Sequence, residues 1–131
     1  GGQHDCQQLE NGNIIVFANG SEQYTPEHSR ILEIDPDSKE VVWQYTGQPK
    51  ITFFSPRISG LCRLANGNTF IVEGNHGRLF EVTKSGDICW EYISPFFNDI
   101  PVHGTVNWVF RARKYSKGNI KLNNLLANLG I

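Results

Sequence analysis

The sequence predicts an all-β chain built from four-stranded antiparallel blades of the β-propeller type, with about two complete blades and part of a third. Short runs rich in β-branched and aromatic residues, separated by Gly, Pro, Asn and Asp, predict strands and turns. Leu-Glu-Asn-Gly-Asn at 9–13 returns as Leu-Ala-Asn-Gly-Asn at 64–68, and Trp43 and Trp90 stand 47 residues apart. A period near 45 residues with several short strands per copy is typical of a propeller.

The first blade is expected over about residues 4–46, with strands at 5–9, 13–18, 30–35 and 40–46. Asn11-Gly12 predicts a type I′ turn, which needs positive φ at both central positions. Asp35-Pro36-Asp37-Ser38 predicts the turn between the last two strands, since Asp side chains accept hydrogen bonds from the backbone just ahead of them.

The second blade is expected over about residues 57–93, with strands at 58–64, 68–73, 78–83 and 87–93. Its last turn is Lys84-Ser85-Gly86, and a longer loop at 19–29 accounts for the greater length of the first copy. Trp43 and Trp90 on the last strands are expected to pack between blades, and Phe53-Phe54 is expected to pack as well.

The pattern weakens after Pro95, and residues 102–131 are predicted to form a partial blade with a C-terminal segment. Residues 102–114 resemble the inner strand of a third copy. Apolar residues at 122, 125, 126 and 129 have helical spacing and predict a helix over 120–131. Fraying, capping and docking on a neighbour are all open for this helix.

Composition excludes several classes of protein. Twelve basic residues against thirteen acidic residues give a net charge of −1, which argues against nucleic acid as a partner. No apolar run is long enough to span a membrane, and no signal-peptide pattern opens the chain. Cys6, Cys62 and Cys89 match no metal motif and are expected to be buried as small apolar residues. No cluster of His or carboxylates has metal-ligand spacing, so neither a metal nor a cofactor is predicted.

Two blades and a part cannot close a propeller ring, which has about four to eight blades. An open set of blades exposes strand edges and an apolar face. The ring is therefore completed either by copies of the chain or by the remainder of a longer protein. We favour a homo-oligomer, and three copies of two blades would give a six-bladed trimer.

The chain resembles the arylsulfotransferase-type propeller family over roughly residues 4–115. The resemblance is carried by His-Asp at 4–5, the segments at 9–13, 29–36 and 42–45, Phe-Phe-Ser-Pro at 53–56, and the segments at 58–60, 63–69, 73–74, 77–82, 90–92 and 109–112. It implies a six-bladed fold, a periplasmic or secreted location, and transfer of a sulfuryl group between phenols through a histidine without a nucleotide donor.

The candidate site is expected around the central channel of the ring. Loops that enter the inner strands, and loops between second and third strands, lie on one face of a propeller. The candidates on that face are His4 as the nucleophile, with Arg57, Ser59, His76 and His103 as binding residues for a small aromatic or sulfated ligand. Arg63 is a second candidate for holding sulfate, or else it packs between blades. His28 is expected at the surface.

Structural roles compete with these assignments. His4 could be a hydrogen-bonded structural residue, and His76 and His103 could be solvated loop residues. Three functions are therefore carried forward: an arylsulfotransferase-like enzyme, a non-catalytic ligand-binding module, and a purely structural propeller assembled from identical two-blade subunits.

Overall fold

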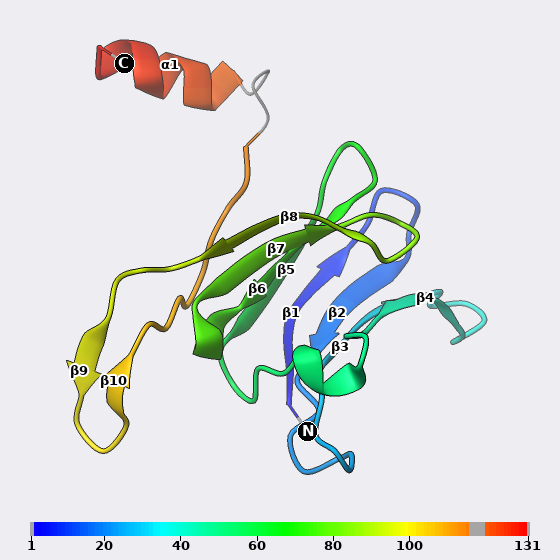
Figure 1. Cartoon of the computed structure of the whole chain (residues 1–131). Coiled ribbons are helices and arrows are strands. Elements are labelled where there is room, and N and C mark those ends of the chain that lie inside the picture. The colour runs from blue at the N-terminus through cyan, green and yellow to red at the C-terminus, as the bar shows by residue number, and fades with distance from the viewer. Residues whose placement is uncertain (1, 116–119, 131) are drawn as a thin grey trace.

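The computed structural model describes residues 2–115 and 120–130, which form two four-stranded antiparallel sheets, a small hairpin and a C-terminal helix (Figure 1). The first sheet contains β1 (Gln3–Gln8), β2 (Ile14–Ala18), β3 (Arg30–Ile34) and β4 (Val41–Tyr45), in sequence order. The second contains β5 (Ser59–Arg63), β6 (Thr69–Glu73), β7 (Arg78–Val82) and β8 (Ile88–Ile93), in the same order. The predicted all-β class and the eight strands are confirmed, each strand to within two residues at its ends.

The hairpin turns differ in type from the prediction. The Leu9 N–H donates to the Asn13 carbonyl at 2.8 Å, and the Gly12 N–H donates to the Leu9 carbonyl at 2.9 Å. Gly12 has φ +89°, whereas Asn11 is not among the residues with positive φ. The loop is thus a three-residue connection closed by a left-handed glycine rather than a type I′ turn. Asn11 keeps a different role, because its Oδ1 accepts the Asn13 N–H at 3.1 Å.

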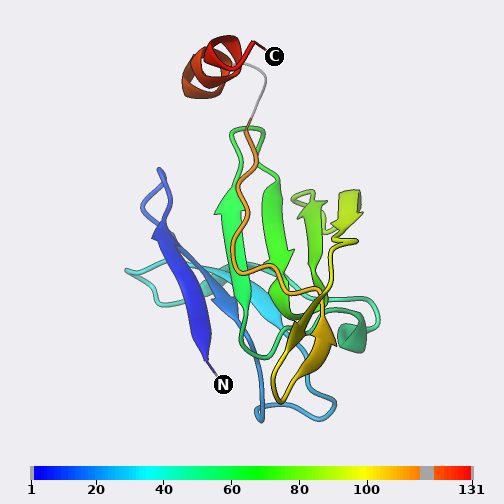
Figure 2. The same cartoon turned by 90° about the vertical axis from the view of Figure 1, so that its left-hand side faces the viewer.

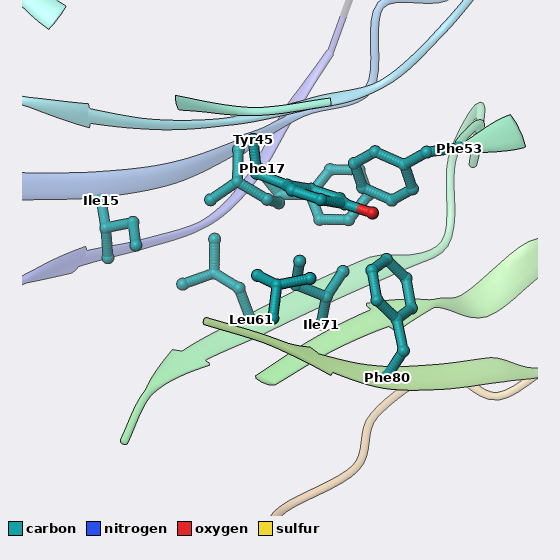
Figure 3. Packing of buried hydrophobic residues seen from close by; sticks show 9 residues of the cluster. Ile15, Phe17, Tyr45, Phe53, Leu61, Ile71 and Phe80 are labelled. Carbon is teal, nitrogen blue, oxygen red and sulfur yellow. The ribbon is translucent and has the colours of Figure 1, made fainter. Parts of the chain in front are cut away.

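The main core lies between the two sheets (Figure 3). Residues two apart on a strand share a face, and Ile15 and Phe17 of β2 point toward Ile71 of the second sheet. Phe53 enters from the connection between the sheets, after a short 3-10 turn at Lys50–Thr52. It is fully buried, with its ring centroid 5.3 Å from that of Phe17. The expectation that Phe53 packs is confirmed.

Beside the apolar core, polar side chains also join the two sheets. Arg63 Nη2 lies 2.6 Å from Glu33 Oε2, and the Arg63 guanidinium stacks 4.8 Å from the Trp43 ring. Trp43 Nε1 donates to the Lys84 carbonyl at 2.8 Å. Trp43 therefore packs between the sheets as predicted, and of the two roles considered for Arg63 the structure shows packing.

The segment after the second sheet does not form the single strand predicted over 102–114. Only β10 (Gly104–Val106) is a strand there, paired with β9 (Asn98–Ile100). The chain from 107 to 114 then runs back across the second sheet without joining it (Figure 2). Its contacts are specific: the Val109 N–H donates to the Gly74 carbonyl at 3.0 Å. A strand needs a hydrogen-bonded partner strand, and among the described residues 107–114 pairs with no edge of either sheet.

The far end of this segment is also anchored. Lys114 Nζ forms an ion pair with Glu81 Oε2 and lies 4.7 Å from the centre of the Trp90 ring. Trp90 nevertheless stays 41% exposed, because no further sheet covers this face among the described residues. Its packing role is only partly realised.

Two expectations about burial are wrong. His28 is only 6% exposed, because its ring packs 4.5 Å from the Tyr24 ring and its Nδ1 lies 2.9 Å from the Pro26 carbonyl oxygen. The loop folds back on itself, which its polar composition concealed. Cys6 and Cys89 are exposed, since they lie on the edge strands of the two sheets rather than in the core.

The C-terminal helix α1 runs from Ile120 to Asn128, which confirms a helix at this position. Leu125 and Leu129 are more than half exposed. The helix stands apart from both sheets (Figure 1). Within the described part of the chain, no helix has the length and apolar character required to cross a membrane.

Candidate functional site

A pocket of about 370 Å³ opens where the first strands of the two sheets begin, a volume within the range of small-molecule sites. One wall comes from the start of β1, a second from the start of β5 with the loop before it, and a third from the segment after β10. The lining residues are His4, Asp5, Arg57, Ile58, Ser59, Gly60, Leu61, Val72, Phe110, Arg111, Ala112 and Arg113.

An irregularity in β1 shapes the first wall. The register between β1 and β2 shifts between His4 and Gln7, and Asp5 there adopts φ +49°, a left-handed conformation that Asp tolerates better than most residues. Asp5 Oδ2 accepts the Leu61 N–H at 2.8 Å, and Gln7 Nε2 donates to the Leu61 carbonyl at 2.7 Å. Gln7 Nε2 also donates to Asp5 Oδ1 at 2.9 Å. Asp5 thus joins β1 to β5, and both carboxylate oxygens are engaged.

The tautomer of His4 follows from a chain of hydrogen bonds. Asn19 is fully buried, and its Nδ2 donates to the Ser55 carbonyl at 2.7 Å. A carbonyl oxygen can only accept, so the amide nitrogen of Asn19 must face Ser55, and its Oδ1 faces His4 Nδ1 at 2.6 Å. Since Oδ1 also only accepts, His4 Nδ1 must carry a proton. In the neutral ring Nε2 then bears the lone pair, and it has no hydrogen-bond partner among the described residues.

Ser59 and Arg57 are positioned by two asparagines. Asn19 Nδ2 also contacts Ser59 Oγ at 3.1 Å, so the same amide ties His4 to Ser59. Asn75 Oδ1 accepts the Arg57 N–H at 3.1 Å and the Ile58 N–H at 2.9 Å. The backbone before β5 is therefore held in place, while the Arg57 side chain stays exposed.

The pocket carries an excess of positive charge. Arg57, Arg111 and Arg113 line it, against the single carboxylate of Asp5. In the described residues none of these three guanidinium groups has a hydrogen bond or an ion pair, whereas Arg63 is bound to Glu33. Guanidinium is the side chain best suited to bidentate binding of oxyanions. The arrangement can bind an anion beside an apolar surface.

Three of the site residues predicted from sequence line this pocket: His4, Arg57 and Ser59. His76 does not: it lies exposed in the 3-10 turn Gly74–His76. His103 does not either, because it lies in the β9–β10 turn with its ring 4.9 Å from the Trp108 ring.

Arg111 and Arg113 were missed as site residues. The signal was present, because two arginines two positions apart occur within the stretch expected to form an inner strand. Inner strands border the channel, and alternate residues of an extended chain share a face.

A larger groove of about 860 Å³ lies between the sheets at the end with the hairpin turns. Its charged and aromatic residues include Glu33, Trp43 and Arg63, which already bind one another. Elsewhere in residues 2–115 and 120–130, no three His, Cys, Asp or Glu side chains come together as a metal site.

No protein-family model and no curated protein matches the chain. A crystal structure of a protein of unknown function from Bacteroides caccae is similar in fold, with a TM-score of 0.50 and 17% sequence identity. The match covers 70% of this chain and 31% of that protein, so the matched part of this chain corresponds to about a third of the larger molecule. At this identity the likeness concerns the fold alone.

Proposed function

We propose that the chain is a segment of a β-propeller related to arylsulfotransferases, comprising two blades and part of a third. The support is a contact between the two sheets that recurs one step further along the chain. Lys114 pairs with Glu81 and lies over Trp90, as Arg63 pairs with Glu33 and lies over Trp43. Lys114 thus bears the same relation to Glu81 and Trp90 of the second sheet as Arg63 of β5 bears to Glu33 and Trp43 of the first.

The function we propose is transfer of a sulfuryl group from an aryl sulfate to a phenol through His4. The observation that carries it is His4, whose Nδ1 donates to Asn19 Oδ1 and whose Nε2 has no hydrogen-bond partner among the described residues, in a pocket lined with arginines. In the neutral ring Nε2 has a free lone pair that can attack sulfur, and a guanidinium of the pocket can bind sulfate oxygens. Asn19 Oδ1 would stabilise the positive charge that develops on the ring, since it accepts from Nδ1–H.

The reaction balances without a further co-reactant. In the first step His4 Nε2 forms a bond to sulfur, the bond between sulfur and the phenolic oxygen breaks, and the leaving phenolate takes a proton from water. In the second step the oxygen of an acceptor phenol bonds to sulfur, the N–S bond breaks, and the phenol proton passes to solvent. The products are a free phenol and a new aryl sulfate.

The test uses 4-nitrophenyl sulfate as donor and phenol as acceptor. We expect release of nitrophenol by the wild-type chain, and a protein mass increase of one SO₃ group, located at residue 4, when the acceptor is omitted. Both signals should disappear in His4→Gln and persist in the control Lys50→Gln, because Lys50 is exposed and lies outside the pocket. Turnover that survives in His4→Gln would remove His4 from the mechanism.

One observation favours a second candidate, ligand binding without turnover. Both oxygens of Asp5 are engaged, and no other carboxylate lines the pocket to act as a base for the acceptor phenol. Saturable binding of an aryl sulfate without formation of product would support this non-catalytic binding function. A chain that shows neither binding nor turnover would have a structural role only.

Ring completion is part of the proposal. Trp90 and Tyr92 of β8 are about 40% exposed, on the face where a further blade would pack. We propose a homo-oligomer, with a trimer giving six blades. In a trimer, β1 of the neighbouring copy would have to lie against the second sheet, where residues 107–114 now lie. In a longer polypeptide, the next blade would instead continue from residues 107–114.

A further inference from the structure

We infer that the pocket takes an aromatic ligand carrying two separate anionic groups. The inference rests on the pocket named in the proposed function, but it does not depend on any turnover there. It starts from a mismatch of charge. Three arginines and one carboxylate line the pocket, so its fixed charges sum to +2 before His4 is considered. An aryl sulfate carries a single negative charge and would leave one positive charge without a counterpart.

The arginines come from two separate walls. Arg57 belongs to the loop before β5, where Asn75 holds its backbone N–H. Arg111 and Arg113 belong to the segment that crosses the second sheet. Cations placed on separate elements suit two anionic groups held apart better than one compact anion.

The wall formed by the segment after β10 is held in position at both ends. Val109 N–H is bonded to the Gly74 carbonyl on one side, and Lys114 is paired with Glu81 on the other. Arg111 and Arg113 lie between these anchors. Their backbone is thereby fixed beside the pocket, which lowers the entropy that a ligand would lose in ordering them. Neither arginine has a hydrogen bond or ion pair to another described residue, so both are available to an anion.

The remaining lining is apolar. Leu61 and Val72 lie at the base of the pocket and are almost fully buried, and Phe110 is 67% exposed at its rim. An exposed aromatic ring beside arginines offers a stacking surface for a second ring. The ligand expected is therefore a flat ring that contacts Phe110 and places one anionic group at Arg57 and the other at Arg111 and Arg113.

The probes are benzenesulfonate and benzene-1,3-disulfonate, because sulfonates cannot transfer a sulfuryl group from oxygen and keep constant charge. Binding is measured by titration calorimetry at an ionic strength of about 0.1 M, where distant charges are screened. We expect the disulfonate to bind at least tenfold more tightly to the wild-type chain. Arg113→Gln and Arg111→Gln should each remove most of that preference while leaving the benzenesulfonate affinity within about twofold.

Arg57→Gln should weaken both probes, and the control Lys50→Gln neither, with circular dichroism confirming that each variant is folded. Equal affinity for the two probes would overturn the inference, and so would a Lys50→Gln variant that loses the preference as much as Arg113→Gln. Propane-1,3-disulfonate tests the aromatic part, which is refuted if it binds as tightly as the benzene compound. His4→Gln should retain the preference for the disulfonate even if it loses all turnover, so failure of the catalytic proposal and failure of this one give different results.

Discussion

Substituting Arg63 by Met tests whether the ion pair between the sheets stabilises the fold. The Arg63 side chain is 18% exposed and the Glu33 side chain 11%, so the pair is largely but not fully removed from water. Breaking a fully buried pair by removing one partner costs about 3–5 kcal/mol. Because some water reaches this pair, and Asn13 Nδ2 still donates to Glu33 at 2.8 Å, we expect a loss of about 2–3 kcal/mol in the free energy of unfolding.

The assay is urea unfolding at neutral pH in a double-mutant cycle with Glu33→Gln. Removing the charge from Glu33 should make the Arg63→Met change less costly, with a coupling of about 1–2 kcal/mol. Lys114→Met provides the matched comparison at the second contact. Its side chain is 35% exposed, so the expected loss there is smaller, about 1 kcal/mol. An Arg63→Met variant within about 0.5 kcal/mol of wild type, or a larger loss for Lys114→Met, would refute the reasoning.

Four further predictions follow from the structure. Phe53→Leu should lower the free energy of unfolding by about 1–2 kcal/mol and Phe53→Ala by about 3–5 kcal/mol in the same assay, because its ring is fully buried. Gly77→Ala should release the chain after β10 and speed its cleavage by protease, because a Cβ there would lie 2.3 Å from the Asn107 carbonyl oxygen and φ is +59°; unchanged cleavage would contradict this. Burial alone would raise the pKa of Glu81, but hydrogen bonds from Lys114 and two asparagines outweigh burial and hold the pKa below its ordinary value of 4.5. The stability that ionised Glu81 contributes is therefore present above that ordinary value and is lost as the pH falls through the lowered pKa. Lys114→Met should move this loss to higher pH in urea unfolding followed from about pH 7 to 3, and an unshifted profile would count against it. Light scattering on a sizing column should give the mass of a trimer if copies close the ring, whereas a monomer would assign the remaining blades to a longer chain.

The strands could be predicted from sequence because their signal is local. Alternation of large apolar residues with turn residues at Asn-Gly and Asp-Pro is set by steric preferences within a few residues. The same holds for Phe53, whose size and position between two predicted blades left burial as the favourable state. The terminal helix was visible for a similar reason, since the spacing of its leucines is a local property.

Burial and pairing that depend on distant residues could not be predicted in the same way. His28 lies in a polar loop, and only the fold of that loop against Tyr24 and Pro26 buries it. Cys6 was expected to be buried as a small apolar residue of a strand, but β1 lies at one edge of its sheet and Cys6 is exposed. Residues 102–114 have strand-like composition, yet a strand also needs a partner edge, and β9 pairs with only three of them.

The candidate site shows the same division. That His4 and Ser59 lie close together follows from aligning the two copies, since both precede the Asn-Gly turn at equal spacing. The wall that carries Arg111 and Arg113 does not follow from that alignment, because these residues reach the pocket only through the course of the chain after β10.

The contact made by Lys114 links the two halves of the proposal. It repeats the contact of Arg63, which supports the view that residues 107–114 start a third blade. It also fixes the segment that carries Arg111 and Arg113, and therefore the positive charge of the pocket. Lys114→Met should then weaken benzene-1,3-disulfonate more than benzenesulfonate, although residue 114 does not line the pocket. If stability falls while the binding preference is unchanged, the segment is held mainly by Asn107 and Val109, and the blade-like contact is not what positions the site.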